Sequence, residues 1–343
     1  MYQKLITDDL TNMKQFQGTP YYVYISLSNF CNANCVFCDV HEQRYKQGHV
    51  DVEVLLDELQ SLGTKYIHFI GGGEPLINKD IWKYFGKITN LGMKFAITTN
   101  GFYLDDRKIS ELANYNLNHI FFSIDGHTAE IHDQIRRVPG LWKRATENIV
   151  SLKKAIPKAK IVINHVLNKN NIDFFSNMLQ LKDQIPFDFF NPLLIKDCPE
   201  LEMTNQQIEK YNNSLKDYEK LSVEQHVEFL YDGINFFGID ENLDGMTKKR
   251  WENTNFKCYY PQYASYIDCP TASVYPCDCT IHRSPKLFNC GNLNEKTFTE
   301  IWNDVPMQNL RHKLEHQYMI CKKNCDRANV LFNRTIEEVM LLT

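Results

Sequence analysis

The first two thirds of the chain alternate short apolar runs with longer segments in which apolar residues recur at helical spacing. The short runs are rich in β-branched and aromatic residues, which predicts strands at 21–28, 65–70, 94–98, 119–124, 160–166 and 187–190. The longer segments predict helices at 52–62, 80–91, 105–113, 141–154 and 172–181. This repetition predicts right-handed βαβ units and a parallel sheet, and six strands suit an open or partial barrel.

The pattern changes beyond residue 200, where regular alternation ends. Residues 200–257 are mostly polar and helical and then aromatic-rich, and we interpret them as a bridging segment. Residues 258–343 are cysteine-rich with little periodicity, so we expect bound metal clusters to stabilise their fold. The sequence therefore predicts an N-terminal extension, a partial barrel, a bridge and a small C-terminal domain, at 1–20, 21–199, 200–257 and 258–343.

Composition and charge exclude several classes of protein. The 38 basic and 42 acidic side chains give a net charge of −4, which is unlike the basic footprint of a nucleic-acid-binding protein. The N-terminus does not resemble a signal peptide, and no run approaches the roughly 18 apolar residues of a membrane helix, so we expect a cytoplasmic protein without a membrane partner. The eleven cysteines gather towards the two ends of the chain. In a reducing cytosol that pattern indicates metal ligation rather than disulfides.

Three of these cysteines, Cys31, Cys35 and Cys38, lie within eight residues directly after the first predicted strand. Soft thiolates select zinc or iron–sulfur clusters. Zinc requires four ligands, and the nearest further candidate is His41. Three cysteines can instead hold a cubane cluster and leave one iron open to a non-protein ligand. The spacing thus favours a catalytic cluster, with a zinc site or buried thiols as the alternative.

Polar residues and glycines follow several other predicted strands, as Gly71–Pro75, Asn100, Ser123 and Asp125. In α/β barrels the active site is formed at the carboxyl ends of the strands. We therefore expect these residues and the three cysteines to meet at one rim.

The cysteine spacing C-x3-C-x2-C, with Phe37 before the last cysteine, resembles the signature of the radical S-adenosylmethionine (SAM) superfamily. Four later motifs resemble those of the family in the same order: Gly72-Gly73-Glu74-Pro75, Thr98-Thr99-Asn100-Gly101, Ser123-Ile124-Asp125-Gly126 and His132-Asp133-x-x-Arg136. The resemblance covers roughly residues 20–195. It implies a partial (β/α)6, TIM-like barrel and a [4Fe–4S] cluster on Cys31, Cys35 and Cys38 whose open iron binds SAM.

The resemblance also implies a set of residues that contact SAM: Phe37, Gly72, Gly73, Glu74, Asn100, Ser123, Asp125, Arg136, Asn164 and Val166. Within this set, Glu74 would accept hydrogen bonds from the methionyl ammonium group. Ser123 and Arg136 would meet the carboxylate or the ribose hydroxyls, with Arg137 as the alternative to Arg136. Asn164 and Val166 would lie against the ribose or adenine.

The segment Val274–Trp302 resembles the C-terminal SPASM domain and the shorter "twitch" domain of this superfamily, which bind auxiliary [4Fe–4S] clusters. The full SPASM pattern packs further cysteines near its end, where this chain has only Cys321 and Cys325. The twitch pattern predicts four ligands, which are Cys258, Cys277, Cys321 and Cys325. Cys269, Cys279 and Cys290 are left over, as further ligands or as buried thiols, and Cys198 is expected to be inert. A structural zinc is the alternative for the region.

The resemblance implies that one electron from a flavodoxin or ferredoxin cleaves SAM, and that the 5′-deoxyadenosyl radical removes a hydrogen atom from a substrate. We expect oxidation or dehydrogenation of a small sugar, polyol or aminocyclitol-like metabolite, because an aminocyclitol dehydrogenase is among the twitch-bearing enzymes. Residues 1–20 are also too few for a peptide-recognition domain. The alternatives are cross-linking, epimerisation or oxidation of a ribosomal peptide or protein side chain, and a non-enzymatic iron–sulfur electron carrier or sensor.

Overall fold

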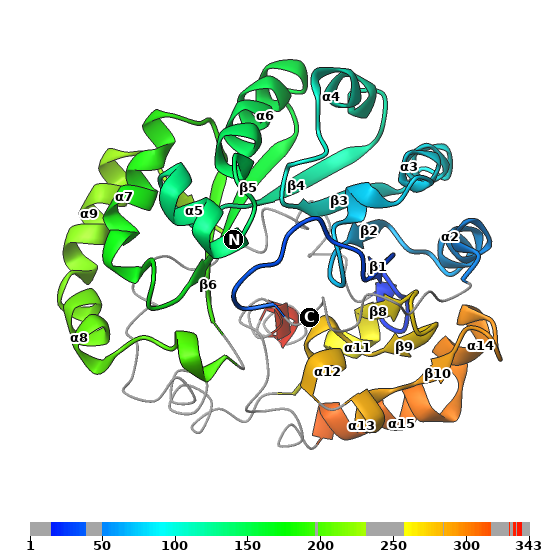
Figure 1. Ribbon diagram of the computed structural model, residues 1–343. Helices are drawn as coiled ribbons and strands as arrows, with labels where there is room; N and C mark the ends of the chain where they lie inside the picture. The colour runs from blue at the N-terminus through cyan, green and yellow to red at the C-terminus, as the bar shows by residue number, and fades with distance from the viewer. Residues whose placement is uncertain are drawn as a thin grey trace.

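The structure, a computed structural model, is built on one curved sheet of ten strands in the order β10-β9-β8-β1-β2-β3-β4-β5-β6-β7 (Figure 1). It describes residues 15–38, 50–195, 198–230, 257–283, 285–316, 329, 332, 333 and 335–337. Six parallel strands follow one another in sequence order: β1 (Tyr22–Ser26), β2 (Tyr66–Phe69), β3 (Lys94–Thr99), β4 (Leu117–Ser123), β5 (Lys160–Leu167) and β6 (Phe189–Leu194).

Helices connect these strands and cover the outer face of the arc (Figure 1). They are α2 (Val52–Ser61), α3 (Ile81–Asn90), α4 (Asp106–Leu112), α5 (Ala129–Arg136), α6 (Leu141–Ala155) and α7 (Phe175–Gln180). Short 3-10 turns lie at η3 (Pro75–Ile77), η4 (Ile172–Phe174), η5 (Leu181–Asp183) and η6 (Pro199–Leu201). This arrangement confirms the predicted α/β partial barrel.

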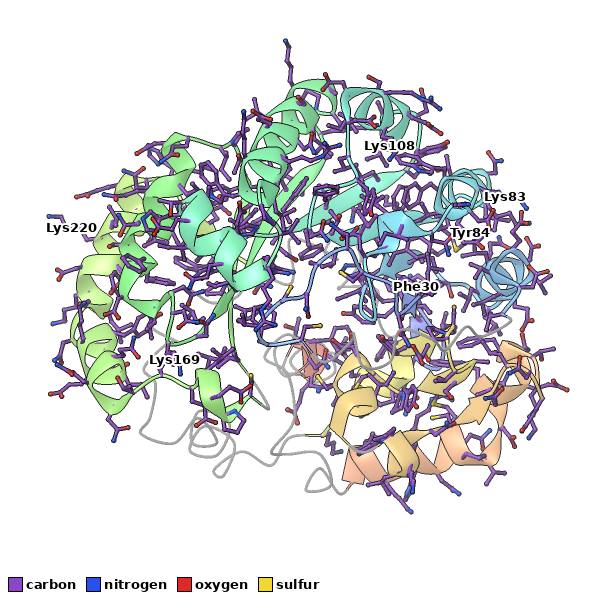
Figure 2. All side chains as sticks on the ribbon, in the orientation of Figure 1. Phe30, Lys83, Tyr84, Lys108, Lys169 and Lys220 are labelled. Carbon is purple, nitrogen blue, oxygen red and sulfur yellow. The ribbon has the colours of Figure 1, made fainter. Side chains whose placement is uncertain are left out.

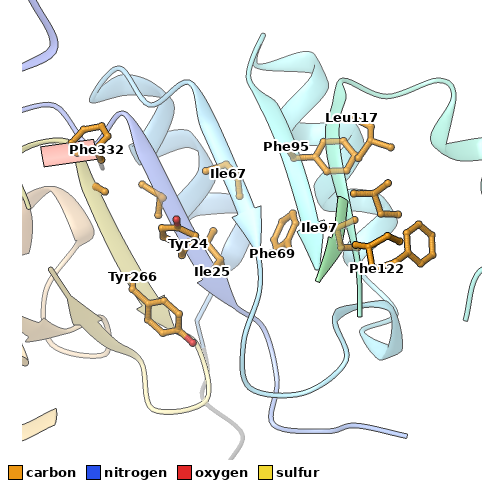
Figure 3. Close-up of a cluster of buried hydrophobic side chains, with 14 of the residues drawn as sticks. Tyr24, Ile25, Ile67, Phe69, Phe95, Ile97, Leu117, Phe122, Tyr266 and Phe332 are labelled. Carbon is orange, nitrogen blue, oxygen red and sulfur yellow. The ribbon is translucent and has the colours of Figure 1, made fainter. Parts of the chain in front are cut away.

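Helix α2 illustrates how the sequence pattern produces this layering. The side chain of Asp51 accepts hydrogen bonds from the backbone N–H groups of Glu53 and Val54, which caps the helix. The buried residues of the helix recur at helical spacing and are Val52, Leu55, Leu56 and Leu59. Their stripe packs on the outward-facing side chains of the sheet, such as Ile25 and Ile67, and forms the main hydrophobic core shown in Figure 3.

The structure describes residues 200–230 and 257 of the segment expected to bridge the two regions, and residues 231–256 lie outside the described residues. Residues 200–230 are largely helical and then rejoin the sheet. Helices α8 (Asn205–Asn213) and α9 (Leu215–Glu224) are followed by β7 (Glu228–Phe229), which pairs in parallel with β6. A capping box between Thr204 and Gln207 fixes the start of α8. Residues 198–230 therefore extend the barrel.

The C-terminal region continues the same sheet on the opposite edge. Its strands are β8 (Ala264–Asp268), β9 (Ser273–Tyr275) and β10 (Gly291–Asn292), and its helices are α11 (Tyr260–Tyr263), α12 (Asp278–Arg283), α13 (Pro285–Phe288), α14 (Phe298–Asn303) and α15 (Val305–His316). Strand β8 pairs in parallel with β1 over five residue pairs, while β9 and β10 are antiparallel. The region shares the main hydrophobic core, because Tyr266 and Phe332 belong to the same buried cluster as Ile25 and Phe69 (Figure 3).

No helix in the described part of the chain is both long and apolar enough to cross a membrane.

Candidate active site at the strand ends

The three N-terminal cysteines lie in the loop that leaves β1 at its carboxyl end. Cys35 is buried and Cys31 and Cys38 are half-buried. Burial is the main cause that raises the pKa of the Cys31 thiol to about 11; the N–H of Ala33 opposes it, and the nearby Glu74, Cys35 and Cys38 add to it. The three thiols are thus close enough to interact electrostatically. A bound metal would supply the positive charge that makes such thiols thiolates, so these residues fit a cluster.

The loop that follows β2 is locked against this cysteine loop. The N–H of Gly73 donates to the carbonyl of Ser28 over 2.5 Å, and the N–H of Glu74 donates to the carbonyl of Phe30 over 2.8 Å. A Cβ atom on Gly73 would lie 1.8 Å from the Phe30 carbonyl oxygen, so a glycine is required there. Phe30 lies on the inner side of the curved sheet, whereas Lys83, Lys108 and Lys220 lie on the outer helices (Figure 2).

Glu74 ties the same loop to the end of β3. Its buried carboxylate accepts hydrogen bonds from the Thr99 hydroxyl and the Asn100 N–H, each over 2.7 Å, and from the Leu76 N–H over 3.1 Å. Burial raises the pKa of Glu74, and these hydrogen bonds oppose the shift. A carboxylate can accept about four hydrogen bonds, so one position is left. Its predicted contact with the SAM ammonium group stays a prediction.

Asn100 connects the end of β3 to the cysteine loop directly. Its Nδ2 donates to Oδ1 of Asn32 over 2.8 Å, while its Oδ1 accepts from the N–H of Phe102. Asn32, which lies between two of the cysteines, was not singled out in the sequence, where only its position within the motif could have drawn attention to it. Two strand ends, those of β2 and β3, therefore hold the cysteine loop in place.

Arg136 brings a third element, helix α5, to the same loop. Its Nε lies 2.5 Å from Oδ2 of Asp125, its Nη1 lies 3.7 Å from Sγ of Cys35, and its guanidinium lies 5.3 Å from the centroid of the Phe37 ring. Asp125 and Cys35 hold the pKa of Arg136 above its usual value although burial opposes this. Arg137 is exposed in the left-handed C-cap position of α5, which leaves Arg136 as the arginine of the site.

Both carboxylate oxygens of Asp125 have partners within the protein. Its Oδ2 pairs with Arg136 and its Oδ1 accepts from the N–H of Val166 over 2.7 Å. Asn171, which the sequence motifs did not indicate, donates to the backbone carbonyls of both Asp125 and Val166. These contacts place Asp125, Arg136 and Val166 together beside the cysteine loop. Through them Asp125 holds the Arg136 side chain in position.

A row of three polar residues crosses the sheet at the same level: Ser123 on β4, Asn164 on β5 and Asn191 on β6 are register neighbours. Nδ2 of Asn191 donates to Oδ1 of Asn164 over 2.8 Å. Among the described residues, the buried Oδ1 of Asn191 has no hydrogen-bond partner. An unpaired buried polar atom calls for a partner such as a bound ligand. This fits a SAM site on the row and adds Asn191 to it.

The C-terminal cysteines separate into two kinds of environment. Sγ of Cys277, Sγ of Cys279 and a carboxylate oxygen of Asp278 lie within 4.8 Å of one another. The pKa of the nearby Cys258 thiol is raised to about 11, chiefly by burial, and Cys279 is among the charges that raise it. The predicted ligands Cys321 and Cys325 lie outside the described residues.

The other cysteines have different partners. Cys290 is buried against Met307, with the two sulfur atoms 3.8 Å apart, and its thiol donates to the carbonyl of Phe288. Cys269 is buried at the end of β8, where burial raises the pKa of its thiol. Cys198 donates to Glu200. The motifs assigned no role to Cys269, Cys279 or Cys290. Among the described residues, only Cys279 of these three belongs to a group of side chains close enough to bind one metal ion.

Two sequence families match the chain. The radical SAM superfamily matches residues 25–180, and SPASM, an iron–sulfur cluster-binding domain, matches residues 258–326. An AdoMet-dependent heme synthase of Oleidesulfovibrio alaskensis is 22% identical over 296 residues, which is 79% of this chain and 71% of that protein. An Fe-coproporphyrin III synthase of Methanosarcina barkeri is 24% identical over 88% of this chain and 78% of its own. A mycofactocin maturase of Mycobacterium tuberculosis is 30% identical, over 44% of this chain and 40% of its own.

Solved structures share the fold. Streptococcus suis SuiB bound to S-adenosylmethionine superimposes with a TM-score of 0.65 at 18% identity, covering 95% of this chain and 77% of its own. The protein anSMEcpe with bound AdoMet gives a TM-score of 0.64 at 16% identity, covering 94% and 97%. At 16–18% identity the similarity to these structures establishes the fold and does not identify the substrate.

Proposed function

Because this chain belongs to the radical SAM superfamily and carries a SPASM domain, we propose that it oxidises an unactivated carbon of an organic substrate inside the partial barrel. When bound, its cofactors supply a 5′-deoxyadenosyl radical for hydrogen abstraction and an acceptor for the second electron of the oxidation. In this proposal Cys31, Cys35 and Cys38 hold the N-terminal [4Fe–4S] cluster, and a flavodoxin or ferredoxin is the electron donor.

The observation that carries the proposal is that three elements converge on the cysteine loop. The loop after β2 binds it through Gly73 and Glu74, the end of β3 through Asn100, and α5 through Arg136. A cysteine loop that held a cluster only for electron transfer would not need these contacts from three separate elements. Held in this way, the three thiolates would have fixed positions, and the proposal places SAM between them and the polar row on β4, β5 and β6.

The residues around the loop then take distinct roles. Arg136, paired with Asp125, places positive charge beside Cys35 and would help to hold the cysteine loop around the cluster. Ser123, Asn164 and Asn191 offer hydroxyl and amide groups to the hydroxyls and ring nitrogens of SAM. The Gly72–Gly73 backbone would contact the amino-acid end of SAM, while the positions that Cβ atoms would take on these glycines are filled by residues 26–30.

The first experiment replaces Cys31, Cys35 and Cys38 together by alanine. We expect the anaerobically reconstituted variant to lose about four irons and to form no 5′-deoxyadenosine with SAM and dithionite, because three thiolates hold one cubane cluster. The remaining iron stays bound. Loss of all iron would contradict two separate sites, and undiminished 5′-deoxyadenosine would contradict the assignment of these ligands.

The inner face of the sheet favours a small, neutral, hydroxyl-rich substrate such as a sugar, polyol or aminocyclitol-like metabolite. The rings of Tyr24, His68 and Phe121, on β1, β2 and β4, pack against one another, and the hydroxyls of Tyr24 and Tyr260 are in hydrogen-bond contact at 3.0 Å. In the part of the chain that the structure describes, Arg136 is a buried cation at this rim and already pairs with Asp125. Neutral donors and aromatic faces suit such a substrate better than a polyanion, which requires unpaired cations.

A peptide is the second candidate, because SuiB bound to its precursor peptide SuiA superimposes on 95% of this chain with a TM-score of 0.66. The names of the heme-synthase relatives add a tetrapyrrole as a third test compound. We would add each class to the reconstituted enzyme with SAM and reductant. The expected result is that polyols stimulate 5′-deoxyadenosine formation and lose two hydrogens by mass. Stimulation by peptides or tetrapyrroles alone would overturn the small-molecule proposal.

A further inference from the structure

The C-terminal region brings together three cysteines that are separated in the sequence. Cys258 precedes α11, whereas Cys277 and Cys279 flank the first residue of α12. The sulfurs of Cys277 and Cys279 lie within 4.8 Å of each other, and Cys258 is close enough to Cys279 for their charges to interact. Cys258 and Cys277 were expected as ligands of an auxiliary cluster, whereas Cys279 was left over.

Two asparagines hold the outer two thiols in place. Nδ2 of Asn329 donates to Sγ of Cys279 over 3.4 Å and to Oδ1 of Asp278 over 3.2 Å. Nδ2 of Asn333 donates to Sγ of Cys258 over 3.6 Å, while its Oδ1 accepts the backbone N–H groups of Tyr259 and Tyr260. Amide donors to sulfur stabilise thiolates and orient metal ligands. Asn329 and Asn333 are four residues apart, and each donates an amide hydrogen bond to one cysteine sulfur. Cys258 and Cys279 thus have the same kind of hydrogen-bond partner.

We propose that Cys279 is an iron ligand of the auxiliary cluster, beside Cys258 and Cys277. Because such a cluster takes four thiolates, at most one of the two other predicted ligands, Cys321 and Cys325, then completes the set. The inference rests on the SPASM domain holding such a cluster, which is part of the proposed function. Soft thiolate sulfur suits iron in a cluster better than the neighbouring carboxylate oxygen of Asp278. The ligand set of this chain then departs from the spacing of the twitch pattern, in which this position is not a ligand.

The test compares Cys279→Ser with Cys290→Ser in the otherwise unchanged, anaerobically reconstituted protein. Cys290 is a control, because its thiol is buried against Met307 and, among the described residues, it is outside the group of possible metal ligands that contains Cys279. We expect Cys279→Ser to lose up to about four irons with matching sulfide, or to change the electron paramagnetic resonance signal of the auxiliary cluster. Cys290→Ser keeps the parental iron and signal. Parental iron and spectra in Cys279→Ser would overturn the proposal.

A second measurement needs no variant and covers the case in which Cys279→Ser fails to fold. The native holoenzyme is alkylated with iodoacetamide before and after removal of iron by a chelator, and each cysteine is followed by mass spectrometry. Cys279 is only partly buried, so we expect it to be protected with iron bound and labelled after iron removal. Labelling of Cys279 in the iron-loaded protein, or stoichiometric zinc in place of iron, would refute the assignment.

These readouts separate the failure of this inference from failure of the proposed function. Formation of 5′-deoxyadenosine depends on the N-terminal cysteine loop, whereas iron content and the auxiliary signal report on Cys279. A protein that cleaves SAM and keeps all its iron in Cys279→Ser retains its proposed function and loses only the new ligand.

Discussion

The ion pair between Arg136 and Asp125 shows how single residues shape this site. Both groups are buried, and an uncompensated buried charge costs several kcal/mol, so each depends on the other. The pair also links β4, α5 and the cysteine loop, because Arg136 reaches Cys35 and the N–H of Val36 donates to the carbonyl of Ile135. Motif spacing predicted that these residues lie at the site. It could not predict that Asp125 and Arg136 bind each other.

Several histidines are buried in the barrel, and His68 is the most enclosed by polar neighbours. Its Nδ1 lies 2.8 Å from the Tyr22 hydroxyl, its Nε2 lies 2.9 Å from the Thr98 hydroxyl, and its ring stacks on Phe121. Burial lowers the pKa of His68 to about 3, with a smaller contribution from His119. The folded protein therefore keeps His68 neutral at pH values where the unfolded chain would protonate it.

This environment makes stability depend on pH in a defined direction. Between pH 6.5 and about 3 the unfolded state binds a proton that folded His68 does not, so the free energy of unfolding falls as pH falls. We predict that His68→Gln reduces the slope of unfolding free energy against pH by about 1 kcal/mol per pH unit between pH 5 and 6. Urea unfolding at several pH values measures it. An unchanged slope would show that His68 is protonated in the folded protein.

At the scale of elements, the loop after β2 carries the strictest steric demand. We predict that Gly73→Ala loses most of the N-terminal cluster iron, because the new Cβ would meet the Phe30 carbonyl oxygen at 1.8 Å and push the cysteine loop away. Gly86→Ala in α3 is the control, since its Cβ would make an ordinary 3.7 Å contact with Tyr115. Iron content and 5′-deoxyadenosine formation are measured for both. Equal iron in the two variants would contradict the steric argument.

The elements themselves were predictable to different degrees. The six barrel strands were placed correctly, because each is a buried, β-branched or aromatic run, although the sixth lies at 189–194 rather than 187–190. The helix expected at 172–181 is instead divided between η4 and α7. Helix α5 was missed because only Ala129, Ile131 and Ile135 of its eight residues are apolar, although Thr128 caps its start. Strands β9 and β10 have three and two residues, too few for a periodic pattern.

At the scale of the whole molecule, the chain forms one continuous sheet. The parallel pairing of β8 with β1 joins residues about 240 positions apart, for which no local pattern gives a signal. Thr299 of α14 donates from its N–H and hydroxyl to Glu58 of α2, and the indole of Trp302 donates to the carbonyl of Gly18 over 2.7 Å. The cysteine motifs predicted two metal-binding regions, whereas their shared core emerged only from the fold.

Trp302 provides a test of this coupling between the ends of the chain. It is buried, and the guanidinium of Arg311 lies 3.8 Å from its ring. We predict that Trp302→Phe lowers the unfolding free energy by about 2–3 kcal/mol, through the lost hydrogen bond and cation–π contact and the cavity left behind. Trp142→Phe also removes a hydrogen bond from an indole N–H to a carbonyl. Because Trp142 is half-exposed, we expect this substitution to lower the unfolding free energy by only about 1 kcal/mol. Equal losses in urea unfolding would contradict the prediction.

The pairing of β8 with β1 has a consequence for how electrons would travel between the two clusters of the proposed function. Ser26, the last residue of β1, lies opposite Asp268, the last residue of β8. The chain runs on from β1 to Cys31, whereas after β8 it turns back through the antiparallel strand β9 and reaches Cys277 toward the amino ends of β1 and β8. In the proposed function the two clusters would therefore lie toward opposite ends of the paired strands, and the backbone hydrogen bonds of one sheet would set the distance between them. Electron transfer between the clusters would then need no domain movement.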